Sequence, residues 1–375
     1  MINKSKLNWI SKKIEEIDGR VEKFWNKPIW KNTPVLQVHV GKIYTDCRTS
    51  ESSFKAQMES IEETLRTKTD WAPFLEPWHG TGVYAEAFGS PYFWKENDFP
   101  WTNFAIHSIE EAKKIKKPDW KKSEIMNLVL ESIRYFKKRV GENIPISLTD
   151  TQSPLDTAML IWETNSFFEA CYDAPEVVHH LLNVVTELII EFSLVQVRDI
   201  GHNIARPGHN AVLTRPWGKA TGIGISDDFL VTVSPKFYNE FSRPYNEKIA
   251  EALGGAVIHS CGVWSQDIIS EVLRTKGIMG VELAISEGGK SSLHLSQMCG
   301  DPNPNLPETI RDGFKDTGVP VKGRLGDNPI NILERVYHPD LIFIPQIMWD
   351  EDNRVRDENY EKMHQKIEEL SERSG

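Results

Sequence analysis

A histidine and a cysteine stand one residue apart at the end of an apolar run, in the stretch VIHSCGV at residues 257–263. Alternate residues of a β-strand point to the same face, so His259 and Cys261 are predicted to project in one direction. Gly262 lets the chain turn directly after them. A neutral imidazole and a thiolate are ligand types that zinc prefers. The spacing predicts half of a zinc site, although a packed histidine beside a buried thiol would leave the same pattern.

Polar groups also follow other apolar runs, which end in SLTD, ISDD, VELAISE and KGRLGDN. Asp150 closes the first run and is predicted to bind substrate. Asp227 and Asp228 close the second, and because strand residues alternate between two faces, only one of them is expected to face a pocket. We assign a catalytic role to Asp227 and interpret Asp228 as the cap of the next helix. Glu282 in the third run is a candidate metal ligand, and Arg324 in the fourth is assigned a catalytic role.

Two stretches rich in Gly and Pro are predicted to form loops over the pocket. The first is dense in tryptophan, at residues 71–101, and its Trp78 and Tyr84 are predicted to contact substrate. An aromatic packing layer is the alternative interpretation of this stretch. The second, ARPGHNAVLTRPWGKATG, contributes His209 and Arg215 as further substrate-binding candidates.

Strand-like and helix-like segments alternate along the chain from about residue 144 onward, joined by short connectors. The predicted strands are 35–40, 144–150, 222–228, 256–262, 278–286, 319–326 and 341–347. The predicted helices are 51–67, 173–201, 234–255, 265–277, 306–318, 328–340 and 355–374. This alternation implies an α/β fold of parallel strands with crossover helices, and about eight strands fit a (β/α)8 TIM barrel better than an open sheet. The carboxyl ends of barrel strands form the active-site face, which would gather the candidate residues.

Composition narrows the class of protein. The 375 residues carry a formal net charge of −10, which argues against a nucleic-acid binder. The first residues lack the apolar core of a signal peptide, and no apolar run reaches the length that spans a membrane. The four scattered cysteines indicate a reducing compartment, so we expect a cytoplasmic enzyme with a small-molecule substrate, and we consider a homodimer. We expect one domain, with an N-terminal helical extension at 1–33, the barrel at 34–350 and a C-terminal helix at 351–375.

The region around the His-x-Cys motif resembles a known family. SPKFYNEFSRPYNEKIAEALGGAVIHSCG is similar to the signature region of the uroporphyrinogen decarboxylase superfamily, nearest the branch of cobalamin-dependent methyltransferases, in which a Ser-Pro helix precedes a His-x-Cys-Gly strand. The segments SLTDTQSPLDTAMLIWETNSFFEACYDAPEVVHHLLNVVTE and GIGISDD resemble the same family. The resemblance spans roughly residues 140–350 and implies a TIM barrel, in agreement with the alternation of elements.

The resemblance implies methyl transfer between a small substrate and a corrinoid (cobalamin). A separate protein would carry the corrinoid, because the chain lacks an Asp-x-His-x-x-Gly cobalamin-binding segment. In that branch zinc is held by His-x-Cys and by a second cysteine near the last barrel strand, but LIFIPQIMWDEDN contains no cysteine. Three hypotheses follow: Cys299 completes the site with His259 and Cys261, Glu282 completes it, or the site holds no metal.

Residues 30–60 lack the Arg-Gln-Ala-Gly-Arg-Tyr segment of the decarboxylases, which argues against uroporphyrinogen decarboxylation itself. Two alternatives to methyl transfer stay open. One is a metal-free lyase of decarboxylase type that acts on a small or medium carboxylic acid, for which Arg215 and Arg324 would supply positive charge. The other is a non-catalytic barrel that binds a ligand.

Overall fold

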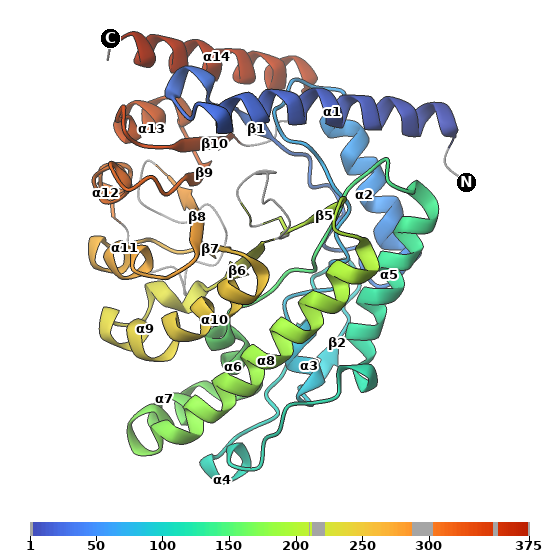
Figure 1. Cartoon of the computed structure of the whole chain (residues 1–375), viewed down its shortest axis with the longest axis vertical. Helices are drawn as coiled ribbons and strands as arrows, with labels where there is room; N and C mark the ends of the chain where they lie inside the picture. The colour runs from blue at the N-terminus through green and yellow to red at the C-terminus, as the bar shows by residue number, and fades with distance from the viewer. Residues whose placement is uncertain (1–2, 210, 212–221, 287–302, 348–351, 374–375) are drawn as a thin grey trace.

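The computed structural model describes residues 3–209, 211, 222–286, 303–347 and 352–373 (Figure 1). Its α-helices are α1 (Lys4–Asn26), α2 (Ser50–Leu65), α3 (Val83–Ala87), α4 (Ile109–Ala112), α5 (Glu124–Val140), α6 (Pro154–Ile161), α7 (Thr164–Asp173), α8 (Pro175–Ile200), α9 (Pro235–Phe241), α10 (Arg243–Leu253), α11 (Gln266–Leu273), α12 (Leu306–Phe314), α13 (Pro329–Val336) and α14 (Asn353–Glu372). Its 3₁₀ helices are η1 (Trp30–Asn32), η2 (Trp120–Lys122) and η3 (Asp228–Val231). Its strands are β1 (Leu36–Gln37), β2 (Tyr92–Phe93), β3 (Trp101–Thr102), β4 (Ile146–Ser147), β5 (Ala205–Arg206), β6 (Ile223–Ser226), β7 (Ala256–Ser260), β8 (Ile278–Ile285), β9 (Val321–Leu325) and β10 (Phe343–Ile347).

A parallel sheet of six strands, in the order β1-β10-β9-β8-β7-β6, forms the larger part of a barrel. Short pairings continue the ring: Gln152 bridges Ser226 in β6, β4 pairs with β5, and Ile146 in β4 bridges Leu75. The amide of Asp70 donates a hydrogen bond of 3.0 Å to the carbonyl oxygen just before β1. The ring therefore returns to its first strand, and the fold is the expected TIM barrel with an N-terminal helix.

Strand burial and helix starts explain why this sequence forms these elements. Every residue of β6 and of β7 is buried, as expected for parallel strands covered by helices on one side and by the barrel interior on the other. Serine side chains cap three of the helices that alternate with the strands. Ser153 precedes α6, Ser234 precedes α9 and Ser265 precedes α11. Each accepts a hydrogen bond from an amide of the first turn, which satisfies a donor that the helix cannot.

The expected helix at 234–255 is two helices in the structure. α9 ends at Phe241 and α10 begins at Arg243, with Pro244 in its first turn. Proline has no amide hydrogen and disfavours helical backbone at the residue before it, so the chain restarts the helix there. The expected strands at 35–40 and 144–150 shrink to the two-residue strands β1 and β4, and β5 begins the stretch expected to be a loop.

One described helix, α8, is long and apolar enough to cross a membrane by length and composition, contrary to the expectation from the sequence. Most of its most apolar window is buried inside the protein, and it packs against α5, α6 and α10. α8 thus packs in the layer of helices that surrounds the strands (Figure 1).

The first and last helices lie side by side, with α1 in blue and α14 in red (Figure 1). The buried carboxylate of Asp70 joins them, because it accepts from Arg20 of α1 at 2.8 Å and from Tyr360 and His364 of α14 at 3.0 and 3.2 Å. The same carboxylate accepts the amide of Val35 just before β1. The terminal helices are therefore tied to the barrel through one side chain.

Candidate metal centre

Three charged side chains stand in one row across neighbouring barrel strands. In the pairing of β7 with β8, His259 is the register partner of Glu282, and in the pairing of β8 with β9, Glu282 is the partner of Lys322. Parallel strands lie about 4.8 Å apart, which brings such partners into direct reach. All three residues are buried. The sheet register, rather than any loop, therefore sets their spacing.

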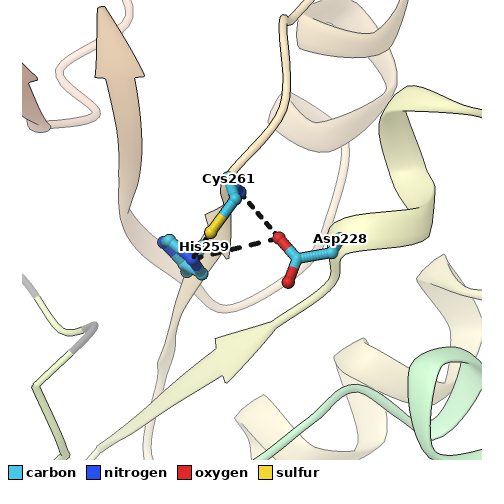
Figure 2. A group of neighbouring side chains, drawn as sticks. All are labelled: Asp228, His259 and Cys261. Atoms are coloured by element: carbon cyan, nitrogen blue, oxygen red, sulfur yellow. Dashed lines mark hydrogen bonds and ion pairs between the residues drawn. The ribbon is translucent and has the colours of Figure 1, made fainter. Parts of the chain in front are cut away.

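His259, Cys261 and Asp228 bring three donor atoms together where β6 and β7 end (Figure 2). The Nε2 atom of His259 lies 3.2 Å from Cys261 Sγ and 3.9 Å from Asp228 Oδ1, and the three donor atoms all lie within 4.8 Å of one another. An imidazole nitrogen, a thiolate sulfur and a carboxylate oxygen are zinc ligands, and three protein ligands with one open position are typical of a catalytic zinc site. The donor set fits zinc.

Backbone hydrogen bonds hold Asp228 at this position. Its Oδ1 accepts the amide of Cys261 at 2.6 Å, which joins the end of β7 to η3. Its own amide donates to Asp156 at 2.6 Å, and the amide of Phe229 donates to the same carboxylate at 3.2 Å. Burial first, and then the charges of Asp227 and Asp228, raise the pKa of Asp156 well above its ordinary value. Hydrogen bonds within the protein therefore fix the position of Asp228 without a metal.

The turn after Cys261 requires glycine for a steric reason. A Cβ atom at Gly262 would lie 2.3 Å from Cγ2 of Val231 in η3, well inside van der Waals contact. This close approach lets η3 carry Asp228 up to the His-x-Cys pair.

Glu282 occupies the far side of the imidazole. Its carboxylate is hydrogen-bonded to Nδ1 of His259, while Arg324 Nε lies 2.7 Å and Lys322 Nζ 3.9 Å from its Oε1. A metal-binding histidine typically donates its other ring N–H to such a carboxylate, which fixes the tautomer and the ring orientation. Glu282, one of the two candidates for a third ligand, contacts the Nδ1 side of the ring in this structure, and Asp228 is the residue that brings a third donor atom beside His259 and Cys261.

The charges along this row oppose the effect of burial on the pKa of each member. Burial acts to raise the pKa of Glu282, but Arg324, His259 and Lys322 hold it well below its usual range. Burial acts to lower the pKa of His259, but the charge of Glu282 and the contact with Cys261 raise it well above its ordinary value. Burial lowers the pKa of Lys322 to about 8, against the opposing charge of Glu282. Arg324 also donates to Cys261 Sγ at 3.7 Å, so a cation stands beside the thiol.

The structure exchanges the expected positions of Asp227 and Asp228. The carboxylate of Asp227 is fully buried, and its Oδ2 accepts from Ser242 and from Asn246 at 2.7 Å, where α9 meets α10. It thus holds the helices against the barrel, which does not match the catalytic role assigned to it. Only one aspartate of the pair faces the site, as the alternation of strand residues predicts. That residue is Asp228, because the chain turns into η3 at this point.

A second group of polar side chains lies across the barrel mouth from His259. Both carboxylate oxygens of Glu76 lie 2.9 Å from Nδ1 of His209. The side chain of Gln57 accepts the amide of Glu76 and donates to its carbonyl, which fixes this carboxylate in place. Lys322 joins the two groups, because its Nζ donates to the carbonyl of His209 at 3.2 Å and lies above the ring of Trp71.

Aromatic rings surround this second group. Trp78 donates to Asp150 at 3.2 Å, and its ring packs edge-on against Tyr44 and against Phe99. Tyr44 lies 6.1 Å from the ring of His209, centroid to centroid. Burial first, and then Glu76 and Asp150, raise the pKa of Tyr44, so its phenol stays protonated. Asp150, Trp78 and His209 thus lie in one cluster around Tyr44, and their role in substrate binding stays a prediction.

Comparison with known proteins agrees with this architecture. A family model described as uroporphyrinogen decarboxylase (URO-D) matches residues 80–205. A uroporphyrinogen decarboxylase of Prochlorococcus marinus is 22% identical over 312 residues, which cover 76% of this chain and 80% of that protein. The protein belongs to the uroporphyrinogen decarboxylase superfamily.

The relatives of this superfamily member are distant. A uroporphyrinogen decarboxylase of Xanthomonas axonopodis pv. citri is 24% identical over 174 residues, and the chain spans only 43% of the length of that protein. A solved structure, a methyltransferase from Methanosarcina mazei, shares the fold with a TM-score of 0.62 at 15% identity, over 90% of this chain and 94% of that one. These likenesses establish the superfamily and the barrel fold. They do not identify the reaction, which has to be inferred from the site.

Several predicted site residues have other placements in this superfamily member. Tyr84 packs against α8, where its ring meets Phe192 edge-on and its hydroxyl lies 3.4 Å from that of Ser193, so it is a core side chain rather than a substrate contact. Arg215 and Cys299 lie outside the described residues. Of the tryptophan-rich stretch, Trp71 and Trp78 reach the second polar group, whereas the half-exposed Trp101 stacks on Phe93 in the β2–β3 hairpin.

Sequence reasoning did not single out Lys322 or Tyr44 and expected Asp228 elsewhere. Lys322 lies two residues before Arg324 in a strand-like run, so the same i, i+2 argument that paired His259 with Cys261 would have found it. Tyr44 lies in a turn after β1, and the sequence holds no periodic signal for it. Asp228 was assigned to a helix cap, because strand periodicity alone does not say where a strand ends.

Proposed function

We propose that the protein is a methyltransferase that moves a methyl group between a small substrate and a corrinoid carried by a separate protein, with the help of zinc. The observation that supports this most directly is the convergence of His259, Cys261 and Asp228 at the carboxyl ends of adjacent barrel strands. Bound there, zinc would hold a substrate heteroatom and keep a thiol in its nucleophilic thiolate form.

The residues around the donor set have distinct parts in this proposal. Glu282 holds the proton of His259 on Nδ1, which leaves the Nε2 lone pair for the metal. Arg324, 3.7 Å from Cys261 Sγ, places a positive charge beside the sulfur that would bind the metal. Asp228 brings a carboxylate that backbone amides already hold in position. The site therefore needs little reorganisation to accept a metal.

Metal content and methyl transfer can be tested on the same protein. We expect one zinc per chain in the wild type, lost in Cys261→Ser and retained in Cys171→Ser, a matched change at a buried cysteine of α7. We expect the zinc-loaded protein to speed the loss of methylcobalamin absorbance in the presence of a small thiol. Free methylcobalamin serves here as the probe for a protein-bound corrinoid. Failure to bind zinc at micromolar concentration, together with no acceleration, would refute the proposal.

A metal-free lyase of decarboxylase type is the second candidate. The observation in its favour is that Lys322, Arg324 and His209 bring three cationic side chains to one barrel mouth, as a carboxylic acid substrate would require. Release of CO2 from small carboxylic acids by metal-stripped protein would favour the lyase, and zinc-dependent methyl transfer would exclude it as the main activity.

A further inference from the structure

The barrel mouth contains two carboxylate–imidazole pairs of the same design. Glu282 holds Nδ1 of His259, and Glu76 holds Nδ1 of His209. Buried Lys322 lies between the pairs, with its Nζ 3.9 Å from Glu282 Oε1 and 3.2 Å from the carbonyl oxygen of His209. The first pair serves the proposed metal. The second pair is also anchored, because Gln57 hydrogen-bonds the backbone of Glu76 on both sides, and the proposed function gives this pair no role.

A cavity of about 70 Å³ borders the second pair. Glu76, His209 and Tyr44 line it together with apolar side chains, among them Val38, Ile61, Trp71 and Phe74. The amide of Gln57 in its wall is satisfied by the backbone of Glu76. The hydroxyls of Ser60 and Thr64 in the same wall are bonded to the backbone of His39. The lining is therefore apolar except at the end formed by Glu76, His209 and Tyr44.

The size and charge of the cavity restrict what it can hold. The cavity is well below the roughly 300–1,000 Å³ of pockets that hold drug-sized ligands, so it suits only a short group. Glu76 lies 2.9 Å from Nδ1 of His209, and its charge raises the pKa of His209 against the effect of burial, so the two side chains offset each other's charge. A charged group of either sign would meet its like charge in the pair, whereas a hydroxyl can hydrogen-bond to it.

We propose that this cavity is a second substrate subsite, in which the Glu76–His209 pair hydrogen-bonds the uncharged polar end of a short substrate. The other end of that substrate carries the heteroatom that meets the metal. This inference rests on the proposed function for the metal end only. The class of substrate is a small thiol or thioether with a neutral hydroxyl at its other end.

The test uses cobalt(II) in place of zinc, because a bound thiolate then gives a sulfur-to-cobalt charge-transfer band. The probes are 2-mercaptoethanol, its isostere 1-propanethiol, which lacks the hydroxyl, and the anionic 3-mercaptopropionate. We expect wild-type protein to bind 2-mercaptoethanol about tenfold more tightly than 1-propanethiol, the effect of one hydrogen bond to a charged group. We expect the anion to bind more weakly than 2-mercaptoethanol.

Variants then assign the preference to the pair. His209→Leu should bring the two neutral thiols to equal affinity without weakening 1-propanethiol, and Glu76→Gln should reduce the preference. His202→Leu, the same change at an exposed histidine, should leave it intact. Equal affinities of the two neutral thiols in the wild type, or an unchanged preference in folded His209→Leu, would overturn the subsite.

Failure of the proposed function has a different signature. If cobalt does not bind, or 1-propanethiol gives no charge-transfer band, the metal proposal is refuted. The imidazole NMR signal of His209, assigned by its loss in His209→Leu, then decides the subsite in metal-free protein. A shift on addition of 2-mercaptoethanol but not of 1-propanethiol would support the subsite, and no shift with either would refute it.

Discussion

Substitution of Glu282 by glutamine should weaken zinc binding while leaving every metal ligand in place. Glutamine keeps the shape of the side chain, so an oxygen can still accept from Nδ1 of His259. The negative charge is lost, however, and Arg324 at 2.7 Å and Lys322 at 3.9 Å then face the metal site without their counter-ion. Loss of a carboxylate that orients a metal-binding histidine typically costs about 10- to 100-fold in metal affinity.

We expect the effect of Glu282→Gln to lie near the upper end of that range, because two cations lose their partner at once. A 100-fold change corresponds to about 2.7 kcal/mol of binding free energy. Competition between the protein and a chromophoric chelator for zinc, at neutral pH, measures the change directly.

The matched control is Glu271→Gln, which removes another carboxylate that pairs with two arginines, Arg243 at 3.1 Å and Arg274 at 2.6 Å, on the outer helices. Its zinc dissociation constant should equal that of the wild type. If the dissociation constant of Glu282→Gln stays within threefold of the wild type while that of Cys261→Ser rises, then Glu282 does not orient the site and the argument from the buried row is wrong.

Two further predictions concern stability and the turn. Burial lowers the pKa of His79 to about 4 from 6.5, so below pH 6.5 the unfolded chain takes up a proton that the folded chain does not, and stability falls by up to about 3 kcal/mol as the pH drops toward 4. His79→Gln should flatten that part of a urea-unfolding pH series, and an unchanged slope would contradict the assignment. Gly262→Ala should destabilise the protein by about 1–3 kcal/mol and loosen zinc, because its Cβ meets Val231, and added Val231→Ala should restore both. Thermal unfolding and chelator competition check this, and a fully stable Gly262→Ala would show that the turn adjusts freely.

The barrel and the His-x-Cys pair could be predicted from the sequence because both depend on short-range periodicity. Parallel strands appear as apolar runs between helices, and a spacing of two residues fixes a shared strand face. The neighbours of that face depend on sheet register instead. His259 and Glu282 are 23 residues apart and become partners only through the pairing of β7 with β8, so the orienting role of Glu282 could not be separated from a ligand role.

The remaining site residues depend on how strands end and on where connecting segments pass. Asp228, rather than Asp227, faces the site because η3 begins at Asp228, just after β6 ends. The alternation of residues along a strand does not predict where the strand ends. The pairing of Glu76 with His209 joins residues 133 positions apart that lie on two different connecting segments. The Gly and Pro content of both connecting segments predicted that they lie over the pocket. Which of their side chains contact each other can be read only from the folded structure.

The two halves of the barrel mouth are subject to different evolutionary constraints. His259, Glu282 and Lys322 are interlocked by ladder register, so a replacement on one strand disturbs the strands on both sides. Tyr44 and His209 lie on connecting segments, which can gain or lose residues at little cost in free energy without shifting that register. Lineages that share this barrel can therefore acquire new substrates by small steps in the connecting segments, whereas a new chemistry at the strand row requires several coordinated replacements.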